Sequence, residues 1–191
     1  MAKKKYDKNI EKHINANKGI KLDIGCGPRK QEGFLGMDRA ALKGVDIVWD
    51  AEKIPYPLPD NICTHIVLSH VVEHFCPRNI INIMDEIWRI MKVNGKLFIV
   101  SPYAGSKGFW QDPTHTHSWN EASLYYFDPF PANFGTEYNY LYQTYYASPW
   151  KIIDYTWYSV GNMEIYLKKR SMSDREKFIN DTAVPNTGRN S

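Results

Sequence analysis

The segment best suited to holding a nucleotide-like ligand reads Lys21-Leu-Asp-Ile-Gly-Cys-Gly27. Its glycines, Gly25 and Gly27, let the backbone turn sharply and approach a ligand that a Cβ atom would obstruct. Asp38 ends the next apolar run, and a carboxylate there can accept hydrogen bonds from two ribose hydroxyls. We therefore expect a ligand with a ribose at the ends of two neighbouring strands.

The spacing argues against a dinucleotide-dependent dehydrogenase. Gly25 and Asp38 are closer in sequence than the roughly 20 residues typical of NAD-binding proteins, and no third glycine completes the usual fingerprint. Aspartates end three successive apolar runs, at Asp23, Asp38 and Asp50. Two glycines alone would fit a simple tight turn equally well, but this repetition favours a ligand site.

A second cluster of titratable groups reads Asp112-Pro-Thr-His115-Thr-His117. An imidazole that titrates near neutrality can remove a proton from a hydroxyl or an amine. We predict His115 as the general base, Asp112 as the residue that orients it, and His117 as the reserve candidate. Two alternatives stay open: a metal site built from these three residues, and histidines with only a structural role.

A third motif, His70-Val-Val-Glu-His74, fits the H-x-x-E-H pattern of some zinc hydrolases. That chemistry needs both histidines on one face of a long helix. Pro77 follows within a turn, and the apolar run 64–68 leads almost directly into His70, so no long helix is expected there. A hydrolase is the weaker interpretation, and His74 is expected to pack below a ligand.

The elements that must position these residues alternate along the chain. Apolar runs predict strands at 20–24, 34–37, 45–49, 64–68 and 96–100, followed by a hairpin of 152–160 and 163–168 around Gly161-Asn162. Residues 79–92 form the clearest helix pattern, with Asn94-Gly95 as its stop, and residues 9–17 form a weaker one. This order predicts an α/β fold with a Rossmann-like, mostly parallel sheet and a C-terminal antiparallel hairpin. We expect strand 96–100 to be buried on both faces.

The remaining segments predict one domain with an insertion and a tail. Residues 1–170 would form the domain, and a lid of about residues 103–150 would follow the fifth strand. The lid is rich in aromatic residues: Phe109, Trp110, Trp119, Tyr125, Tyr126, Phe127, Phe130, Phe134, Tyr138, Tyr140, Tyr142, Tyr145 and Tyr146. It could form a small core or the wall of an apolar acceptor pocket. Residues 171–191 have little to bury and are expected to form a flexible tail.

Composition excludes several classes of protein. The net charge of the 191 residues is +3, but residues 1–21 alone carry +5, so the rest carries −2. Nucleic acid is therefore not indicated as a partner, because no basic surface is expected on the body. No apolar run could span a bilayer, no secretory signal is visible, and three cysteines without C-x-x-C spacing favour reduced thiols. We expect a cytoplasmic protein without a membrane partner, and the sequence does not indicate an oligomeric state.

Several motifs together resemble the class I S-adenosylmethionine-dependent methyltransferases of type 11, the small-molecule type. The segment 22–27 is similar to their glycine-rich first motif, and Gly36-Met-Asp38 to their ribose-binding acidic position. Segments 50–60 and 66–74 resemble the stretch that lines the adenine pocket and ends the fourth strand, and residues 86–96 resemble the helix into the fifth strand. The likeness covers about residues 18–103. Two departures are the nearly deleted first helix after Gly27 and Val93-Asn94-Gly95 in place of Pro-Gly-Gly.

The resemblance implies an enzyme that transfers a methyl group from S-adenosylmethionine to an oxygen or nitrogen of an acceptor, most naturally a small molecule. It implies cofactor contacts from Asp23, Gly25, Cys26, Gly27, Asp38, Arg39, Asp50, Ala51, Ser69 and His70. The motifs of DNA amino-methyltransferases and cytosine-5 methyltransferases are absent, because residues 69–72 read Ser-His-Val-Val and Cys76-Pro77 has the reverse order. A catalytically silent methyltransferase-like binding module is the alternative.

Overall fold

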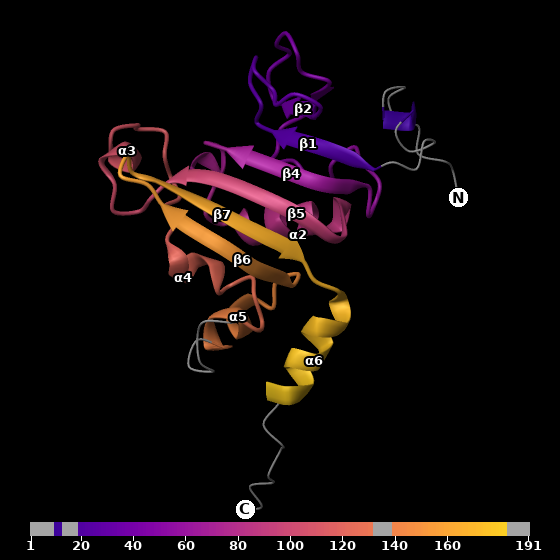
Figure 1. Cartoon of the computed structure of the whole chain (residues 1–191), viewed down its shortest axis with the longest axis vertical. Helices are drawn as coiled ribbons and strands as arrows, with labels where there is room; N and C mark the ends of the chain where they lie inside the picture. The colour runs from indigo at the N-terminus through magenta and orange to yellow at the C-terminus, as the bar shows by residue number, and fades with distance from the viewer. Residues whose placement is uncertain (1–9, 13–18, 132–138, 183–191) are drawn as a thin grey trace, which may run out of the picture.

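A seven-stranded mixed sheet forms the centre of the computed structural model, which describes residues 10–12, 19–131 and 139–182. The strand order is β3-β2-β1-β4-β5-β7-β6 (Figure 1). The strands are β1 (Ile20–Ile24), β2 (Leu35–Asp38), β3 (Ile47–Val48), β4 (Cys63–Ser69), β5 (Met91–Pro102), β6 (Trp150–Trp157) and β7 (Asn162–Lys169). The helices are η1 (Val72–His74), α2 (Ile80–Ile90), α3 (Lys107–Trp110), α4 (Glu121–Leu124), α5 (Asn139–Tyr145) and α6 (Met172–Thr182).

The predicted fold class is confirmed. Strands β1 to β5 pair in parallel, and β7 pairs antiparallel with both β5 and β6. The strand order reverses between β1 and β4, the switch point at which open α/β sheets bind ligands beyond their carboxyl ends. The loops after β1, β2 and β4 therefore meet at one edge of the sheet.

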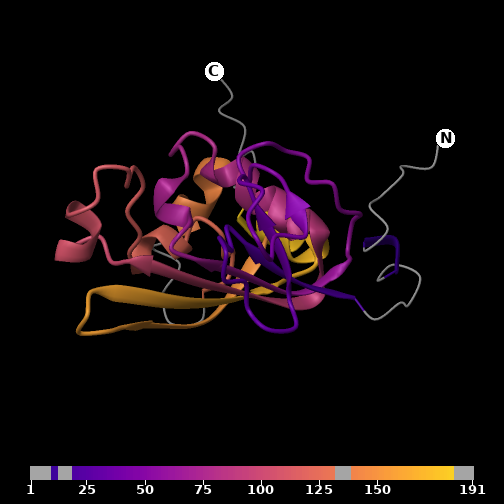
Figure 2. The ribbon, with the colours of Figure 1, turned by 90° about the horizontal axis from the view of Figure 1, so that it is seen from above.

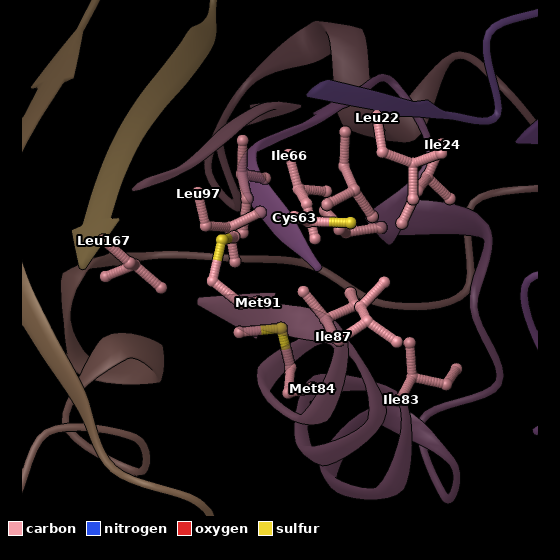
Figure 3. Close-up of a cluster of buried hydrophobic side chains, with 14 of the residues drawn as sticks. Leu22, Ile24, Cys63, Ile66, Ile83, Met84, Ile87, Met91, Leu97 and Leu167 are labelled. Carbon is pink, nitrogen blue, oxygen red and sulfur yellow. The ribbon is translucent and has the colours of Figure 1, made fainter. Parts of the chain in front are cut away.

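Helix α2 covers the centre of the sheet with its apolar face. Its buried apolar residues recur every three or four positions, which places them on one side: Ile80, Ile83, Met84, Ile87 and Ile90. Figure 3 shows this face packed against side chains of the sheet, among them Ile66 and Leu97. Each fully buried side chain of this kind contributes about 1.5–3 kcal/mol. This packing fixes β4 and β5 beneath the ligand-binding edge.

At β5 and β7 the sheet is covered on one face, whereas Ile66, Val67 and Leu68 of β4 are buried in succession, on both faces. Along β5, Leu97 and Ile99 are buried whereas Lys96 is exposed and Phe98 is half-buried, so the expectation of burial on both faces is wrong. Strand β7 alternates in the same way, and Tyr166 stacks on Phe98 with ring centroids 4.6 Å apart. Figure 2 shows α2 and α6 on the same side of the sheet.

Two predicted boundaries differ from the structure. Helix α2 ends at Ile90 and β5 begins at Met91, before the predicted stop, because Met91 already pairs with Cys63 of β4. Residues 172–182, predicted as part of a flexible tail, form helix α6, and Phe178 is only 1% exposed. The charged residues of α6 concealed this one aromatic anchor, which packs on Tyr142 at a centroid distance of 5.0 Å.

Some predictions lie outside the described residues: most of the helix 9–17, the basic cluster in residues 3–8, the aromatic residues Phe134 and Tyr138, and the tail 183–191. Among the helices that the structure does describe, none has the length and apolar character needed to cross a membrane.

Candidate functional site

A pocket of about 410 Å³ opens where the loops after β1, β2, β3 and β4 converge. This volume is in the range of small-molecule and cofactor sites. The pocket is lined by Gly25, Asp38, Arg39, Trp49, Asp50, Ala51, Glu52, His70, Val71, His74, Phe75 and Thr114. It lies at the switch point of strand order, as the sequence predicts for the ligand.

Six of the predicted cofactor residues line this pocket, namely Gly25, Asp38, Arg39, Asp50, Ala51 and His70. The other four, Asp23, Cys26, Gly27 and Ser69, do not line it. Sequence reasoning missed Trp49 and Glu52, although both flank Asp50 and adjacency alone could have found them. It also missed Thr114, whose place at the pocket depends on how a distant segment packs.

Carboxylates hold the loop after β1 in place. Asp38 Oδ2 accepts a hydrogen bond from Gly27 N at 2.8 Å, and its Oδ1 accepts one from Ala40 N at 2.9 Å. A carboxylate has about four acceptor sites, so Asp38 keeps two for a ligand. Asp23 Oδ2 accepts from Gln31 N at 2.8 Å, and burial raises the pKa of Asp23. Asp23 therefore shapes the loop from behind the pocket.

The backbone at Gly25 has a structural reason to be glycine as well as a functional one. Its φ is +68°, in the left-handed region that disfavours a side chain. A Cβ atom there would lie 2.4 Å from Val71 Cγ2. We had expected the clash to be with the ligand alone, but a substitution would also displace Val71, which lines the same pocket. Gly27 also has a positive φ, +53°, but a Cβ atom at this residue meets nothing within 4 Å.

The segment after β4 turns sharply at His70, which has a φ of +56°. Such a conformation is uncommon for a non-glycine residue and is found at ligand sites. His70 Nδ1 lies 3.3 Å from Oε1 of Glu73, and this carboxylate raises the pKa of His70. Only the short turn η1 follows, so His70 and His74 share no long helix. The helical zinc-hydrolase arrangement is therefore not formed.

Residues 112–117 dock onto η1 through backbone hydrogen bonds. Thr116 N and His117 N both donate to Glu73 O, at 2.8 and 3.0 Å, and Thr116 Oγ1 donates to Phe75 O at 2.9 Å. This docking brings Thr114 to the pocket wall beside His74. His115 lies behind, with its ring centroid 4.8 Å from that of His74.

The structure does not give Asp112 the orienting role that we predicted. Asp112 Oδ2 is 3.8 Å from His115 Nε2, which is too long for a hydrogen bond, whereas Oδ1 accepts from Thr114 N at 2.8 Å and from Thr114 Oγ1 at 2.7 Å. The carbonyl of Phe109 orients His115 instead, at 2.8 Å from Nδ1. This partner could not be read from the motif because it comes from helix α3.

His117 faces different surroundings from His115. It lines a second pocket of about 440 Å³ together with Trp119, Tyr126 and Phe127 from the predicted lid. Burial lowers the pKa of His117, so its imidazole is held in the neutral form near pH 7. His115 and His117 therefore do not meet, and the predicted metal site of these two histidines with Asp112 does not form.

Comparisons with known proteins agree with this fold. A family model described as a methyltransferase domain matches residues 31–99, from the loop after β1 into β5. No curated protein matches the chain in sequence. Many solved structures do match, at low sequence identity, and these matches show the fold.

Three of these structures cover most of the chain. An S-adenosylmethionine-dependent methyltransferase from Archaeoglobus fulgidus is 18% identical, with a TM-score of 0.55, over 84% of this chain and 91% of that one. One from Aquifex aeolicus is 16% identical, with a TM-score of 0.51, over 85% and 90%. A 16S rRNA adenine methyltransferase from Catenulisporales acidiphilia is 11% identical, with a TM-score of 0.53, over 90% and 96%.

The sequence match and the shared fold both concern methyltransferases. The family model spans β2 to β4, the strands whose ends form the pocket, and the shared fold extends over the rest of the sheet. Residues 31–99 match a methyltransferase domain, and the chain has the fold of S-adenosylmethionine-dependent methyltransferases.

Proposed function

We propose that the pocket of about 410 Å³ holds S-adenosylmethionine and that the methyl group goes to an oxygen or nitrogen of a small molecule. The observation that carries the proposal is the second, aromatic pocket. Its lining residues Pro77 and His117 lie two and three positions along the chain from Phe75 and Thr114, which line the first pocket. A donor and an acceptor could therefore occupy adjacent sites.

The residues of the first pocket suit the cofactor. Asp38 ends β2 and retains acceptor capacity for the two ribose hydroxyls. Trp49 and Ala51, on the loop after β3, offer apolar surface for the adenine ring, and Asp50 lies between them. Gly25 leaves the backbone accessible. When bound, the cofactor supplies an activated methyl group and its own leaving group, so the protein's task is alignment and exclusion of water.

The second pocket suits a small, partly apolar acceptor. Its walls come from helix α2 and the lid, with Ile80, Ile81 and Tyr145 adding apolar surface to the aromatic residues. Arg78 is the one cation among the lining residues and could bind an acidic group of the acceptor. The net charge of −2 outside residues 1–21 does not favour a nucleic-acid acceptor.

A general base, where the acceptor needs one, is proposed at His115 in the metal-free protein, acting through a bridging water because His115 itself lines neither pocket. A carbonyl accepts but cannot donate, so the contact with Phe109 O places the proton of a neutral ring on Nδ1. The lone pair of Nε2 is then free to take a proton. The side chain of Asp112 has no orienting part in this proposal, because it does not hydrogen-bond the His115 ring. His117 stays the reserve candidate for the base.

The test uses the full chain and S-adenosylmethionine with a labelled methyl group. The purified protein is incubated with separate pools of small metabolites, RNA and protein, and mass spectrometry locates the label. We expect label in the small-molecule pool alone, together with cofactor binding by calorimetry. Label in RNA would overturn the acceptor class, and tight cofactor binding without transfer to any pool would favour a silent binding module.

A further inference from the structure

The side chain of Glu73 is fully buried, with 0% exposure, yet neither carboxylate oxygen has a hydrogen-bond partner among the described residues. Among the described residues His70 Nδ1 lies within ion-pair distance, 3.3 Å from Oε1, and it pairs with Glu73 only when its imidazole is protonated. A buried carboxylate is costly unless it is paired or bound to a metal ion, so each unsatisfied one needs an explanation.

Two imidazoles beside Glu73 each contact a backbone carbonyl through Nδ1, as metal-binding histidines usually do. His74 Nδ1 lies 3.3 Å from Thr114 O, and His115 Nδ1 lies 2.8 Å from Phe109 O. Because carbonyl oxygens only accept, both rings carry the proton of their neutral form on Nδ1, which leaves the Nε2 lone pairs free. A metal-bound histidine typically donates its second ring N–H to such a partner.

These three residues form a cluster of suitable size. One ring nitrogen of each histidine and one oxygen of Glu73 all lie within 4.8 Å of one another. Ligands of a tetrahedral zinc ion, with bonds of about 2.1 Å, are about 3.4 Å apart. The cluster must therefore close by at most about 1.4 Å, and the exposed ring of His74 can supply that movement by rotation.

We propose that Glu73, His74 and His115 form a binding site for one zinc ion at the wall of the cofactor pocket. Two imidazoles and one carboxylate are the ligand set of an open zinc site, with a fourth position for water or substrate. This set differs from the H-x-x-E-H pattern, which would use His70, and from the Asp112 combination expected from the sequence. It joins the turn η1 to the segment 112–117.

The backbone already holds the two ligand segments together. Glu73 O accepts from Thr116 N and His117 N, so Glu73 and His74 keep their place relative to His115 without the ion. His74 and Thr114 line the cofactor pocket. A bound zinc ion would therefore present its open position near the pocket, where it could hold an acceptor oxygen. That role rests on the proposed methyl transfer, but zinc binding itself does not.

The test measures zinc binding by calorimetry on the untagged full chain after chelator treatment, with zinc content determined separately. We expect one zinc per chain, and a loss of affinity of more than about 100-fold in Glu73→Gln, His74→Ala and His115→Ala, beyond the 10–100-fold range of outer-shell changes. Thr114→Val should weaken binding about 10-fold, because it removes one contact to His74 Nδ1. His65→Asn, on β4, is the matched control and should bind like the unaltered chain.

Two further measurements separate loss of the zinc site from loss of the fold. Circular dichroism checks that each variant folds, and the visible spectrum of the Co²⁺-substituted chain should report a tetrahedral site that disappears in Glu73→Gln. Absence of zinc binding in the folded chain, or equal loss in His65→Asn, would overturn the proposal. Cofactor binding in the zinc-free chain tests the proposed function separately, so the two can fail independently.

Discussion

Asp38 combines a structural task with its proposed ligand contact, and the two can be separated by mutation. Asp38→Ala should weaken S-adenosylmethionine binding at least about 10-fold, because a hydrogen bond to a charged group contributes about 1.5–3 kcal/mol. Calorimetry measures the dissociation constant. Asp46→Ala is the control, since Asp46 also accepts a hydrogen bond from a backbone amide, Gly36 N of β2 at 2.7 Å, but does not line the pocket. Equal losses in both variants would show that Asp38 only supports the loop.

The proposed base makes a separate prediction. His115→Ala should keep the cofactor's dissociation constant, because His115 does not line the pocket. Turnover in the presence of chelator should fall at least about 100-fold once an acceptor is known. Steady-state kinetics with His117→Ala as the companion variant measures this. Unchanged turnover would place the base elsewhere or show that the reaction needs none.

The rate at which Cys26 is alkylated tests the pKa of its thiol, which lies in the loop after β1. Burial, together with the charges of Asp23 and Asp38, raises the pKa of Cys26 to about 11, two units above the reference value of 9.0. Only the thiolate reacts, so alkylation at pH 8 should be roughly 100-fold slower than for an ordinary thiol and should rise with pH until about pH 11. Mass spectrometry of iodoacetamide-treated protein measures it. The exposed Cys76 is the internal reference, and equal rates for both thiols would contradict the shift.

At the scale of elements, helix α6 shows how much one buried side chain, Phe178, contributes to the free energy of unfolding. Phe178→Ala should lower the free energy of unfolding by about 3–5 kcal/mol, because a buried aromatic ring is replaced by a cavity. Urea unfolding measures the change. Ile179→Ala is the matched control, since Ile179 is 37% exposed and should change stability little. If the two variants unfold alike, α6 does not pack as described.

Elements with periodic apolar residues could be predicted from the sequence, and elements fixed by distant contacts could not. The spacing of Ile80, Ile83 and Ile87 predicts α2 because the residues that form this apolar face all lie within the helix itself. Helix α6 depends on Tyr142, and its own residues are mostly polar, so composition pointed to a tail. The ends of β1, β2 and β4, whose loops line the first pocket, were predictable for the same reason as α2. The contact between His74 and His115 was not, because it arises from the docking of two segments far apart in sequence.

At the scale of the whole molecule, the cofactor should stabilise the fold. A ligand at about 100 times its dissociation constant adds about 2.7 kcal/mol to the free energy of unfolding. For a domain of this size that corresponds to a rise in Tm of roughly 5–10 °C. Thermal unfolding with and without S-adenosylmethionine measures it. NAD is the control ligand and should leave Tm unchanged; an equal rise with NAD would reopen the dehydrogenase alternative.

The loop that replaces the first helix has a consequence for hydrogen exchange. The amide protons of Gly27 and Gln31 are held by the side chains of Asp38 and Asp23, whereas a helix would hold its amides in a shared ladder. Each such amide can exchange with deuterium when one carboxylate moves, without the melting of a cooperative unit. These two amides of the loop after β1 therefore lack the collective protection that a helix would give them. A ligand that contacts Asp38 would slow exchange at Gly27 directly, through the same oxygen atoms.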